Sequence, residues 1–522
     1  MGTYIDTGNA GFASFRKGIY VDKSGLIAVV NSSLGTERRF SCVSRCRRFG
    51  KTMAAKMLAA YYDRSCCSRS LFSGLRAERD PGFEEHLNKY PVIFFDVSFL
   101  ATRYRDGSIV GKLDAVLKAD VLKAFPDVAC EEDDDLMDCL LRIAEEKGEQ
   151  FIFIIDEWDA ILRELPASTD DYVNWLRRMF KSAPATQVFA AVYMTGILPI
   201  KKYRTQSALN NFTEYSVVEP RKMAPYFGFT KDEVKALAAE SGMSFDELEK
   251  WYDGYQIGEE KSVFNPNSVI QAIYTGRCRS FWASTGAYDN LRDYIRSNFD
   301  GLKDDVLNML GGGRVKVNTT KFQNDMTEVN SRDDVLTVLI HLGYLGYDWR
   351  EESCYVPNYE VGRELQNAVE DTGWTNVAKA LEQSEKLLQA TIDGNAAAVA
   401  SAIEAAHDEN TSILSYNDEN SLSCVLSIAY YCARAYYHIH REFPSGKGYA
   451  DLVLLPRRGE TKPAMVIELK CNRGARAAIS QIRHREYPAK IAEYTGQILL
   501  VGINYDRKKK RHTCRIERWE KE

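Results

Sequence analysis

Two groups of residues in this sequence have the types and spacing that phosphate chemistry requires. The first is Gly50-Lys51-Thr52, which follows the apolar run Phe40–Val43 and opens a helical run. A tight loop between a strand and a helix lets backbone N–H groups and the helix dipole bind phosphate oxygens. In such a loop Lys51 would reach the β- and γ-phosphates, and the Thr52 hydroxyl would bind Mg²⁺. Arg45 stands at the position where the phosphate-loop pattern usually has its first glycine. From these residues alone, a phosphate loop and an ordinary turn are therefore equally favoured.

Two acidic residues, Asp156 and Glu157, follow the continuous apolar run Phe151–Ile155. Such a run is typical of a parallel strand with both faces covered, and ligands bind at the carboxyl ends of these strands. Asp156 would hold the Mg²⁺ shell, and Glu157 would orient and polarise an attacking water. The alternative, two solvated acids after a core strand, is less favoured because a phosphate loop precedes them. Thr195 ends the apolar run Gln187–Gly196, where its hydroxyl could sense a γ-phosphate or simply end a strand.

The second group lies near the C-terminus, on two predicted strands joined by a turn-like segment. These strands cover Tyr449–Pro456 and Ala464–Lys470. Folding them symmetrically about the turn pairs Val453 with Val466. The same register pairs Asp451 with Glu468, and side-chain alternation places Lys470 on their face.

Facing carboxylates repel unless a cation lies between them, and Mg²⁺ takes one or two carboxylates together with water and phosphate oxygens. Lys470 beside the ion could orient or deprotonate water and neutralise charge on a phosphodiester. Asp451, Glu468 and Lys470 therefore predict a metal-dependent nuclease site. For any single residue, a solvated face with a Glu–Lys pair is the alternative.

The predicted strands and helices that must position these residues indicate an α/β protein with several domains. Alternating strands and helices predict a phosphate-loop domain with a parallel sheet over residues 1–220. Residues 221–372 are mainly helical and could include a winged helix, although the acidic stretch Arg350–Glu352 argues against a wing that grips DNA. A helical connector is expected over 373–415, and an α/β domain that carries the predicted nuclease residues over 416–522.

Composition excludes several classes of protein. The chain has 522 residues, 45% hydrophobic and 27% charged, which is ordinary for globular domains. No apolar run approaches a membrane span, and no signal segment is apparent, so we expect a cytoplasmic protein without a membrane partner. The 12 cysteines lack paired CxxC spacings, which indicates neither a disulfide framework nor a zinc site.

Charge is unevenly distributed along the chain. The net charge is −5, yet residues 441–522 hold 19 Lys/Arg against 10 Asp/Glu, including the basic turn Arg507–Arg511. A basic C-terminal segment on an acidic body predicts a polyanionic partner. With the predicted nuclease site in the same segment, we expect nucleic acid, with DNA as the first choice and RNA left open. A basic surface without a partner is the alternative.

Several motifs in this order resemble a bacterial family that joins an AAA-ATPase-like domain to a C-terminal PD-(D/E)XK nuclease-superfamily domain. The motifs are Tyr20-Val21-Asp22-Lys23, Arg47-Arg48-Phe49-Gly50-Lys51-Thr52, Asp156-Glu157-Trp158-Asp159, Trp251-Tyr252-Asp253-Gly254-Tyr255, Gly448-Tyr449-Ala450-Asp451 and Glu468-Leu469-Lys470. They span nearly the whole chain and are specific in combination. Members of the family resemble this chain in having Arg-Arg-Phe-Gly-Lys where a glycine-rich loop is expected. Cys46 departs from the proline often found there.

The resemblance implies a restriction-endonuclease-like fold for residues 416–522, implies ATP and Mg²⁺ as cofactors, and assigns roles to residues. Nucleotide binding and hydrolysis would involve Arg47, Arg48, Gly50, Lys51, Thr52, Asp156, Glu157 and Thr195. Metal binding and phosphodiester cleavage would involve Asp451, Glu468 and Lys470, with Gln481 and Tyr487 in support.

The expected function is an ATP-gated or ATP-driven nuclease acting on DNA. The alternative is a nucleotide-controlled switch that binds nucleic acid or protein without cutting it. A homo-oligomer is consistent with such an ATPase domain. A ring would need an arginine that one subunit supplies to the ATP site of its neighbour. The basic residues after the Thr195 strand, Lys201, Lys202 and Arg204, could stabilise transition-state charge, but surface charge explains them better.

Overall fold

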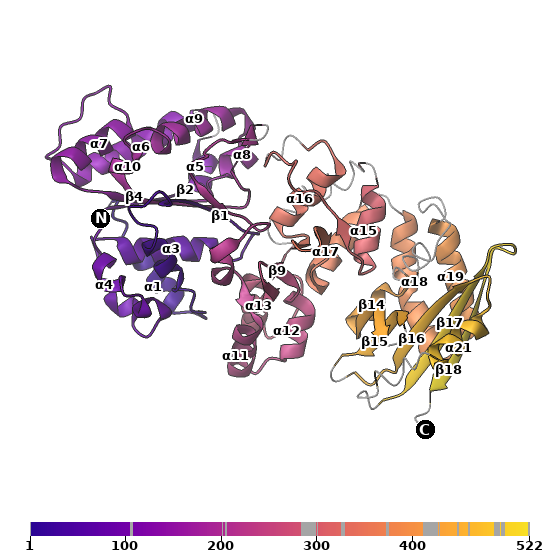
Figure 1. The fold of residues 1–522 in the computed structure, drawn as a ribbon. Coiled ribbons are helices and arrows are strands. Elements are labelled where there is room, and N and C mark those ends of the chain that lie inside the picture. The colour runs from indigo at the N-terminus through magenta and orange to yellow at the C-terminus, as the bar shows by residue number, and fades with distance from the viewer. Residues whose placement is uncertain are drawn as a thin grey trace. The chain divides into compact units, whose positions relative to one another are not determined.

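The fold is shown by a computed structural model (Figure 1). It describes residues 2–104, 108–200, 202–203, 206–282, 299, 301–324, 329–371, 375–410, 426, 429–445, 448–457, 460–484, 491 and 496–519. The chain divides into two compact units. Unit 1 comprises Met1–Ser241, Asp253–Gly276 and Asn318–Trp349; unit 2 comprises Gly242–Tyr252, Arg277–Val317 and Arg350–Glu522.

Unit 1 is built on a five-stranded parallel sheet with the order β2-β3-β4-β1-β7. Its strands are β1 (Phe40–Ser44), β2 (Val92–Asp96), β3 (Phe151–Asp156), β4 (Phe189–Gly196) and β7 (Thr213–Tyr215). The predicted parallel α/β sheet is confirmed. β4 lies between β1 and β3, so the carboxyl ends of these three strands meet at one edge of the sheet.

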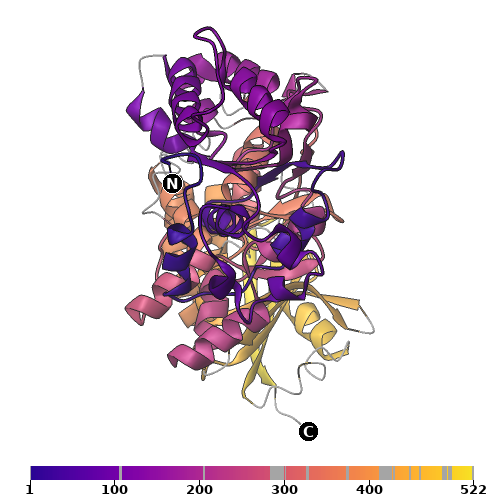
Figure 2. The same ribbon diagram turned by 90° about the vertical axis from the view of Figure 1, so that its left-hand side faces the viewer.

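Helices cover both faces of this sheet because its strands are apolar on both sides. Phe153 and Ile155 of β3 enter one core, and Ile152 and Ile154 enter the other. The first core is covered by α5 (Val97–Arg103), α6 (Ile109–Ala124), α7 (Leu136–Lys147), α8 (Ala160–Glu164), α9 (Thr169–Phe180) and α10 (Ala185–Val188). The second is covered by α1 (Ala10–Arg16), α2 (Leu26–Asn31), α3 (Lys51–Tyr62) and α4 (Phe83–His86). Figures 1 and 2 show these two layers on opposite sides of the strands.

The remaining elements of unit 1 come from three separate stretches of chain. They are η1 (Arg69–Phe72), η2 (Arg76–Arg79), η3 (Pro166–Ser168), β5 (Lys202–Tyr203), β6 (Gln206–Ser207), η4 (Arg221–Tyr226), β8 (Phe229–Thr230), α11 (Lys231–Ser241), β9 (Tyr255–Ile257), β10 (Glu260–Phe264), α13 (Pro266–Thr275), α16 (Arg332–Leu342) and β12 (Gly346–Asp348). β8, β10 and β9 form a small antiparallel sheet.

Unit 2 contains a second five-stranded sheet, with the order β14-β15-β16-β17-β18. The strands are β14 (Tyr437–Ser445), β15 (Gly448–Pro456), β16 (Ala464–Cys471), β17 (Ile498–Asp506) and β18 (Arg511–Trp519). Only β16 and β17 run parallel; the other neighbours are antiparallel. The predicted C-terminal α/β domain is thereby confirmed as a mixed sheet.

One face of this second sheet packs on α18 (Thr375–Ile392) and α19 (Ala396–Asn410). The other face packs on α21 (Ala475–His484), which crosses between the two parallel strands. The other elements of unit 2 are α12 (Phe245–Tyr252), α15 (Leu302–Leu310), β11 (Val315–Lys316), β13 (Ser353–Tyr355), α17 (Tyr359–Asp371) and η6 (Tyr431–Ala435). Within the described parts of the chain, no helix is both long and apolar enough to cross a membrane.

One predicted element differs at its end. The apolar pattern of Glu419–Tyr437 predicts a helix, and within this range residues 419–425, 427 and 428 lie outside the described residues. Tyr437 instead begins β14, because it pairs with Pro456 of β15.

Candidate active sites

The loop between β1 and α3 has the backbone shape of an anion cradle. Arg48 and Gly50 adopt left-handed conformations, with φ of 64° and 92°. Glycine tolerates this conformation at no steric cost, which explains Gly50 immediately before the helix. Gly50, at the N-cap of α3, has no side chain to cap the helix, so the first N–H groups of α3 can donate to a bound phosphate.

Lys51 folds back over this loop. Its side chain is buried, and Nζ donates to the carbonyl oxygens of Arg45 and Cys46, each at 3.1 Å. These are weak neutral acceptors for an ammonium group, so a phosphate could replace them with stronger charge-assisted bonds. The position of Lys51 therefore fits its predicted role.

Arg45, which stands where a glycine is usual, has a structural role. It is fully buried and donates to the carbonyl oxygens of Ser44 and Tyr215, at 2.8 and 2.6 Å. Its guanidinium lies 5.0 Å from the ring centre of Phe227. Burial lowers the pKa of Arg45 to about 10, which leaves it charged at neutral pH. The arginine thus ties the start of the loop to β7.

The other side of the loop packs on later segments of unit 1. Phe49 is buried against Tyr255 of β9, with ring centres 5.0 Å apart, and its carbonyl accepts from the backbone of Gly228. Arg47 is partly buried, and its pKa is lowered by burial and by the nearby charge of Arg163. Arg48 is exposed to solvent. The two predicted arginines therefore lie in different surroundings.

Asp156 lies at the carboxyl end of β3, where the structure brings Thr195 and Thr52 to it. The Thr195 hydroxyl, on β4, donates to Asp156 Oδ1. Burial raises the pKa of Asp156, and hydrogen bonding to Thr195 and Thr52 and the charge of Lys51 oppose that rise. Asp156 Oδ2 is buried without a hydrogen-bond partner among the described residues. A buried carboxylate oxygen beside a threonine hydroxyl fits the oxygen shell of Mg²⁺.

Glu157 adopts an unusual backbone conformation, and its side chain contacts Arg163, a residue for which the sequence predicted no role. Its φ is 51°, and Oε2 lies 2.7 Å from Nη2 of Arg163 on α8. Arg163 also contacts the fully buried Asp159 at 3.1 Å, and Asp159 accepts from the backbone of Leu198 at 3.0 Å. Burial raises the pKa of Glu157, while the charges of Lys51 and Arg163 lower it. Asp159 belongs to the predicted motif Asp156-Glu157-Trp158-Asp159, and the signal for Arg163 is its position one helical turn after Asp159.

The second candidate site is built on the β15–β16 hairpin, whose predicted register is confirmed. Val453 pairs with Val466, and Leu452 pairs with Ile467. Asp451 Oδ2 accepts from the backbone N–H of Leu469 at 2.7 Å, which fixes the carboxylate beside β16. The hairpin therefore brings Asp451 to the same stretch of β16 as Glu468 and Lys470.

Glu468 lies at the centre of this site. Lys470 Nζ is 2.9 Å from Glu468 Oε1, and their side chains are only 11% and 2% exposed. The Gln481 amide, on α21, donates to the same oxygen. Three of the predicted residues thus meet at one carboxylate, with Asp451 on the neighbouring strand. Carboxylate oxygens of this kind are the ligands that hard divalent cations take.

Asn504 supports the site and was not foreseen. It pairs with Lys470 across the parallel strands and accepts from the backbone of Arg473 and Gly474, at 2.9 and 2.8 Å. These bonds fix the turn that leads into α21 and so orient Gln481. Tyr487, the other predicted supporting residue, lies outside the described residues, as do Lys201 and Arg204.

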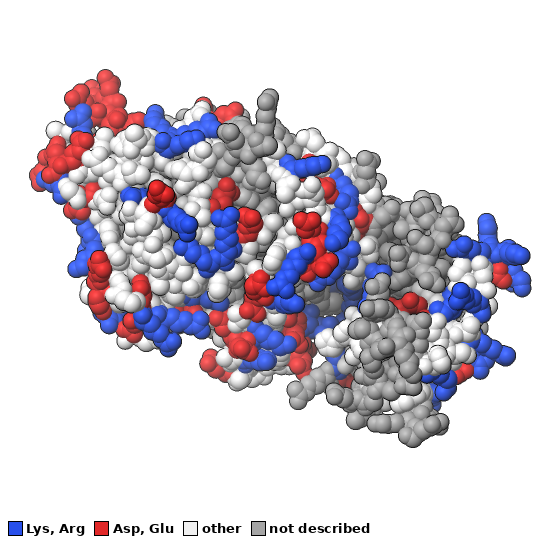
Figure 3. Space-filling model, viewed as in Figure 1, with Lys and Arg blue, Asp and Glu red and all other residues white. Residues whose placement is uncertain are grey.

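Basic side chains gather at the tip of the β17–β18 hairpin, where Arg507–Arg511 are exposed (Figure 3). They are carried by the same sheet as the Glu468 site. This is the arrangement that a phosphate backbone could contact.

Comparisons with known proteins find matches in both regions of the chain that hold the candidate sites. Residues 8–205 match the family described as "Predicted AAA-ATPase", and residues 418–515 match the PD-(D/E)XK nuclease superfamily. A curated relative, an uncharacterized protein encoded in the vnfD 5′ region of Azotobacter chroococcum, is 28% identical over 299 residues. The chain spans about half the length of this relative, 54%.

Solved structures show more distant likeness. The ORC2 protein of Aeropyrum pernix is 12% identical, with 71% of this chain and 99% of that chain covered and a TM-score of 0.33. Cdc6p of Pyrobaculum aerophilum is 10% identical, with 67% and 93% covered and a TM-score of 0.25. The sheet topologies and these matches support an α/β fold in which an AAA-ATPase-like region precedes a region that matches the PD-(D/E)XK nuclease superfamily, in the predicted order.

Proposed function

We propose that the protein binds and hydrolyses ATP and that its C-terminal domain cuts DNA in a Mg²⁺-dependent reaction controlled by the nucleotide. The observation that carries the nuclease half is the buried Glu468 carboxylate, with Lys470 and Gln481 on one oxygen and Asp451 on the adjacent strand. We also propose that the chain divides into domains near residues 220, 372 and 415, as the sequence predicts.

In the nuclease reaction, Asp451 and Glu468 would hold Mg²⁺, which when bound supplies an activated water and polarises the phosphate. The ammonium of Lys470 stabilises negative charge as it develops on the phosphodiester. Gln481 keeps the Glu468 carboxylate oriented. The exposed basic turn at Arg507–Arg511 contributes contacts to the DNA backbone that do not depend on base sequence.

In the ATPase reaction, Lys51 would neutralise phosphate charge, and Thr52 and Asp156 would hold the cation. Glu157 would orient the attacking water and accept its proton. Arg163 sets the position of Glu157 through their 2.7 Å ion pair. The Thr195 hydroxyl, on the strand between β1 and β3, donates to Asp156 and could sense a γ-phosphate.

The experiment measures phosphate release and cleavage of plasmid and linear DNA in the same reactions, with and without ATP and Mg²⁺. We expect Lys51→Ala to lose phosphate release and nucleotide control, and Glu468→Gln to lose cleavage while it keeps phosphate release. The matched control is Glu460→Gln, which removes a partly exposed acid from the turn between β15 and β16.

Two results would overturn the proposal. One is DNA cleavage that persists in Glu468→Gln at the rate of the unmodified protein. The other is nucleotide-dependent DNA binding without any metal-dependent cleavage, which would identify a binding switch instead of a nuclease.

A further inference from the structure

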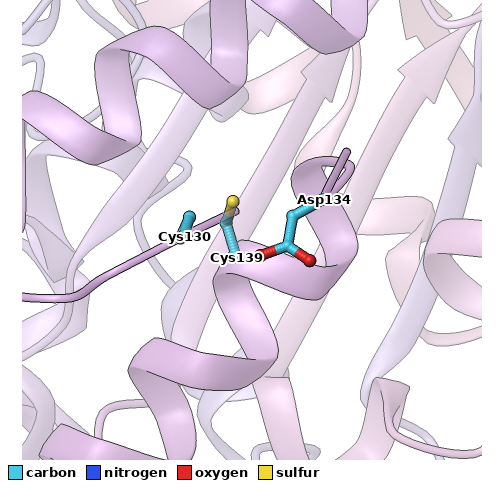
Figure 4. Close-up of side chains that lie close together, drawn as sticks. All are labelled: Cys130, Asp134 and Cys139. Atoms are coloured by element: carbon cyan, nitrogen blue, oxygen red, sulfur yellow. The ribbon is translucent and has the colours of Figure 1, made fainter. Parts of the chain in front are cut away.

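The connection between α6 and α7 brings together three side chains of the types that bind metals (Figure 4). Cys130 lies in the irregular segment after α6, Asp134 in the turn before α7, and Cys139 in the first turn of α7. Their two sulfur atoms and a carboxylate oxygen all lie within 4.8 Å of one another. Neither candidate active site uses any of these residues.

The backbone that carries this cluster is well fixed. Lys118 Nζ donates to the carbonyl oxygens of Glu131 and Asp134. Arg142 Nε lies 3.0 Å from Asp134 Oδ2, and Asp135 caps the start of α7 in a reciprocal capping box. A carboxylate held by a neighbouring donor is already oriented, which is how ligands of metal sites are supported.

We propose that Cys130, Asp134 and Cys139 bind a thiophilic divalent cation such as Zn²⁺. Bonds of roughly 2.3 Å to sulfur and about 2.0–2.2 Å to oxygen would place the three donor atoms within the span already present. Binding forms two metal–sulfur bonds and one metal–oxygen bond, and the two thiol protons pass to solvent. A water completes the fourth position. The ion would cross-link the α6–α7 connection to the first turn of α7.

Acidic side chains near the cluster favour a cation over an oxidised thiol pair. Glu131, Glu132 and Asp133 of the same connection are exposed, and Figure 3 shows acidic side chains gathered near α7. Their negative charge would attract a divalent cation to the three donor atoms.

The test uses the full, reduced chain and either Zn²⁺ or Co²⁺ alone as the probe. Native mass spectrometry gives the zinc stoichiometry, and the Co²⁺–thiolate charge-transfer absorption reports sulfur ligation, which the oxygen-rich Mg²⁺ sites cannot produce. We expect one sulfur-ligated ion in the unmodified protein. Cys130→Ser and Asp134→Asn should weaken its affinity by about tenfold or more. Because Cys139 is fully buried and its substitution could prevent folding, the partly buried Cys130 is the primary variant.

Cys66→Ser serves as the control, since Cys66 adjoins Cys67 in the same unit and lies outside the cluster. It should retain the ion and its absorption. Absence of sulfur-ligated metal from the unmodified protein, its retention in Cys130→Ser, or its loss in the control would overturn the proposal. A Cys130–Cys139 disulfide in protein purified without added oxidant would also overturn it.

Discussion

Replacing Lys470 by methionine tests whether Glu468 is a metal-binding carboxylate, independently of any catalysis. The change keeps most of the side-chain stem but removes the ammonium group 2.9 Å from Glu468 Oε1. Both side chains are nearly buried, and removing one partner of such a pair costs about 3–5 kcal/mol. The hydrogen bond from Gln481 remains and moderates the loss, so we expect destabilisation near the lower end, about 3 kcal/mol.

A divalent cation should reverse part of this loss. Without metal, the Lys470→Met variant leaves a buried negative charge with less compensation. The variant also lacks the ammonium that repels a cation at Glu468, so Mg²⁺ or Mn²⁺ should bind it more tightly than it binds the unmodified protein. At saturation, each tenfold difference in Kd returns about 1.4 kcal/mol of the loss, so the two stabilities should converge as the cation concentration rises.

The assay is urea unfolding followed by hydrogen exchange of the β16 amides, because a chain with two compact units need not unfold in one step. The matched control is Lys462→Met, which removes an ammonium group from the ion pair with Glu460. In both pairs the lysine follows the glutamate by two residues. That pair is about a third exposed, so its loss should cost under about 1 kcal/mol and show no response to metal. If Lys470→Met is as stable as the unmodified protein, or gains no more from metal than the control, the reasoning about Glu468 is wrong.

Three further predictions concern unit 1. Lys51→Ala should weaken ATP binding by at least about tenfold, as expected when a charged hydrogen bond is lost, and unchanged affinity for a fluorescent ATP analogue would contradict the loop assignment. Burial raises the pKa of Glu157, and only its ionised carboxylate can accept a proton. As the pH is lowered, kcat for phosphate release should therefore begin to fall at a higher pH than it would with an ordinary glutamate as the base. An acid limb in the ordinary glutamate range would argue against Glu157 as the base. Gly196→Ala would place a methyl group 2.5 Å from the ring of the buried Trp158, so thermal unfolding should show a loss of about 1–3 kcal/mol, and an unchanged Tm would refute that contact.

Strand positions and the hairpin register could be predicted because they depend on patterns local to the sequence. The apolar run Phe151–Ile155 is buried on both faces of a sheet, and that burial requires a continuous apolar segment. The pairing of Val453 with Val466 followed from the turn length alone. The chemistry of Asp451, Glu468 and Lys470 followed from that register.

Features that depend on long-range contacts could not be predicted. β7 is only three residues long, and its place beside β1 depends on tertiary packing. The buried Arg45 appeared as a defect of the phosphate loop because its acceptor, the Tyr215 carbonyl, lies far along the chain. Likewise, the proximity of Cys130 to Cys139 arises from the turn before α7 and not from a paired cysteine motif.

The most direct test of the central claim is the conversion of supercoiled plasmid DNA across a Mg²⁺ titration, with ATP present, by the unmodified protein and by Asp451→Asn. The substitution preserves the size of the side chain and removes the charge that would hold the cation. We predict cleavage that rises with Mg²⁺ in the unmodified protein and is lost in the variant. Equal cleavage by both proteins, or none by the unmodified protein at any Mg²⁺ concentration, would contradict a nuclease site at Asp451 and Glu468.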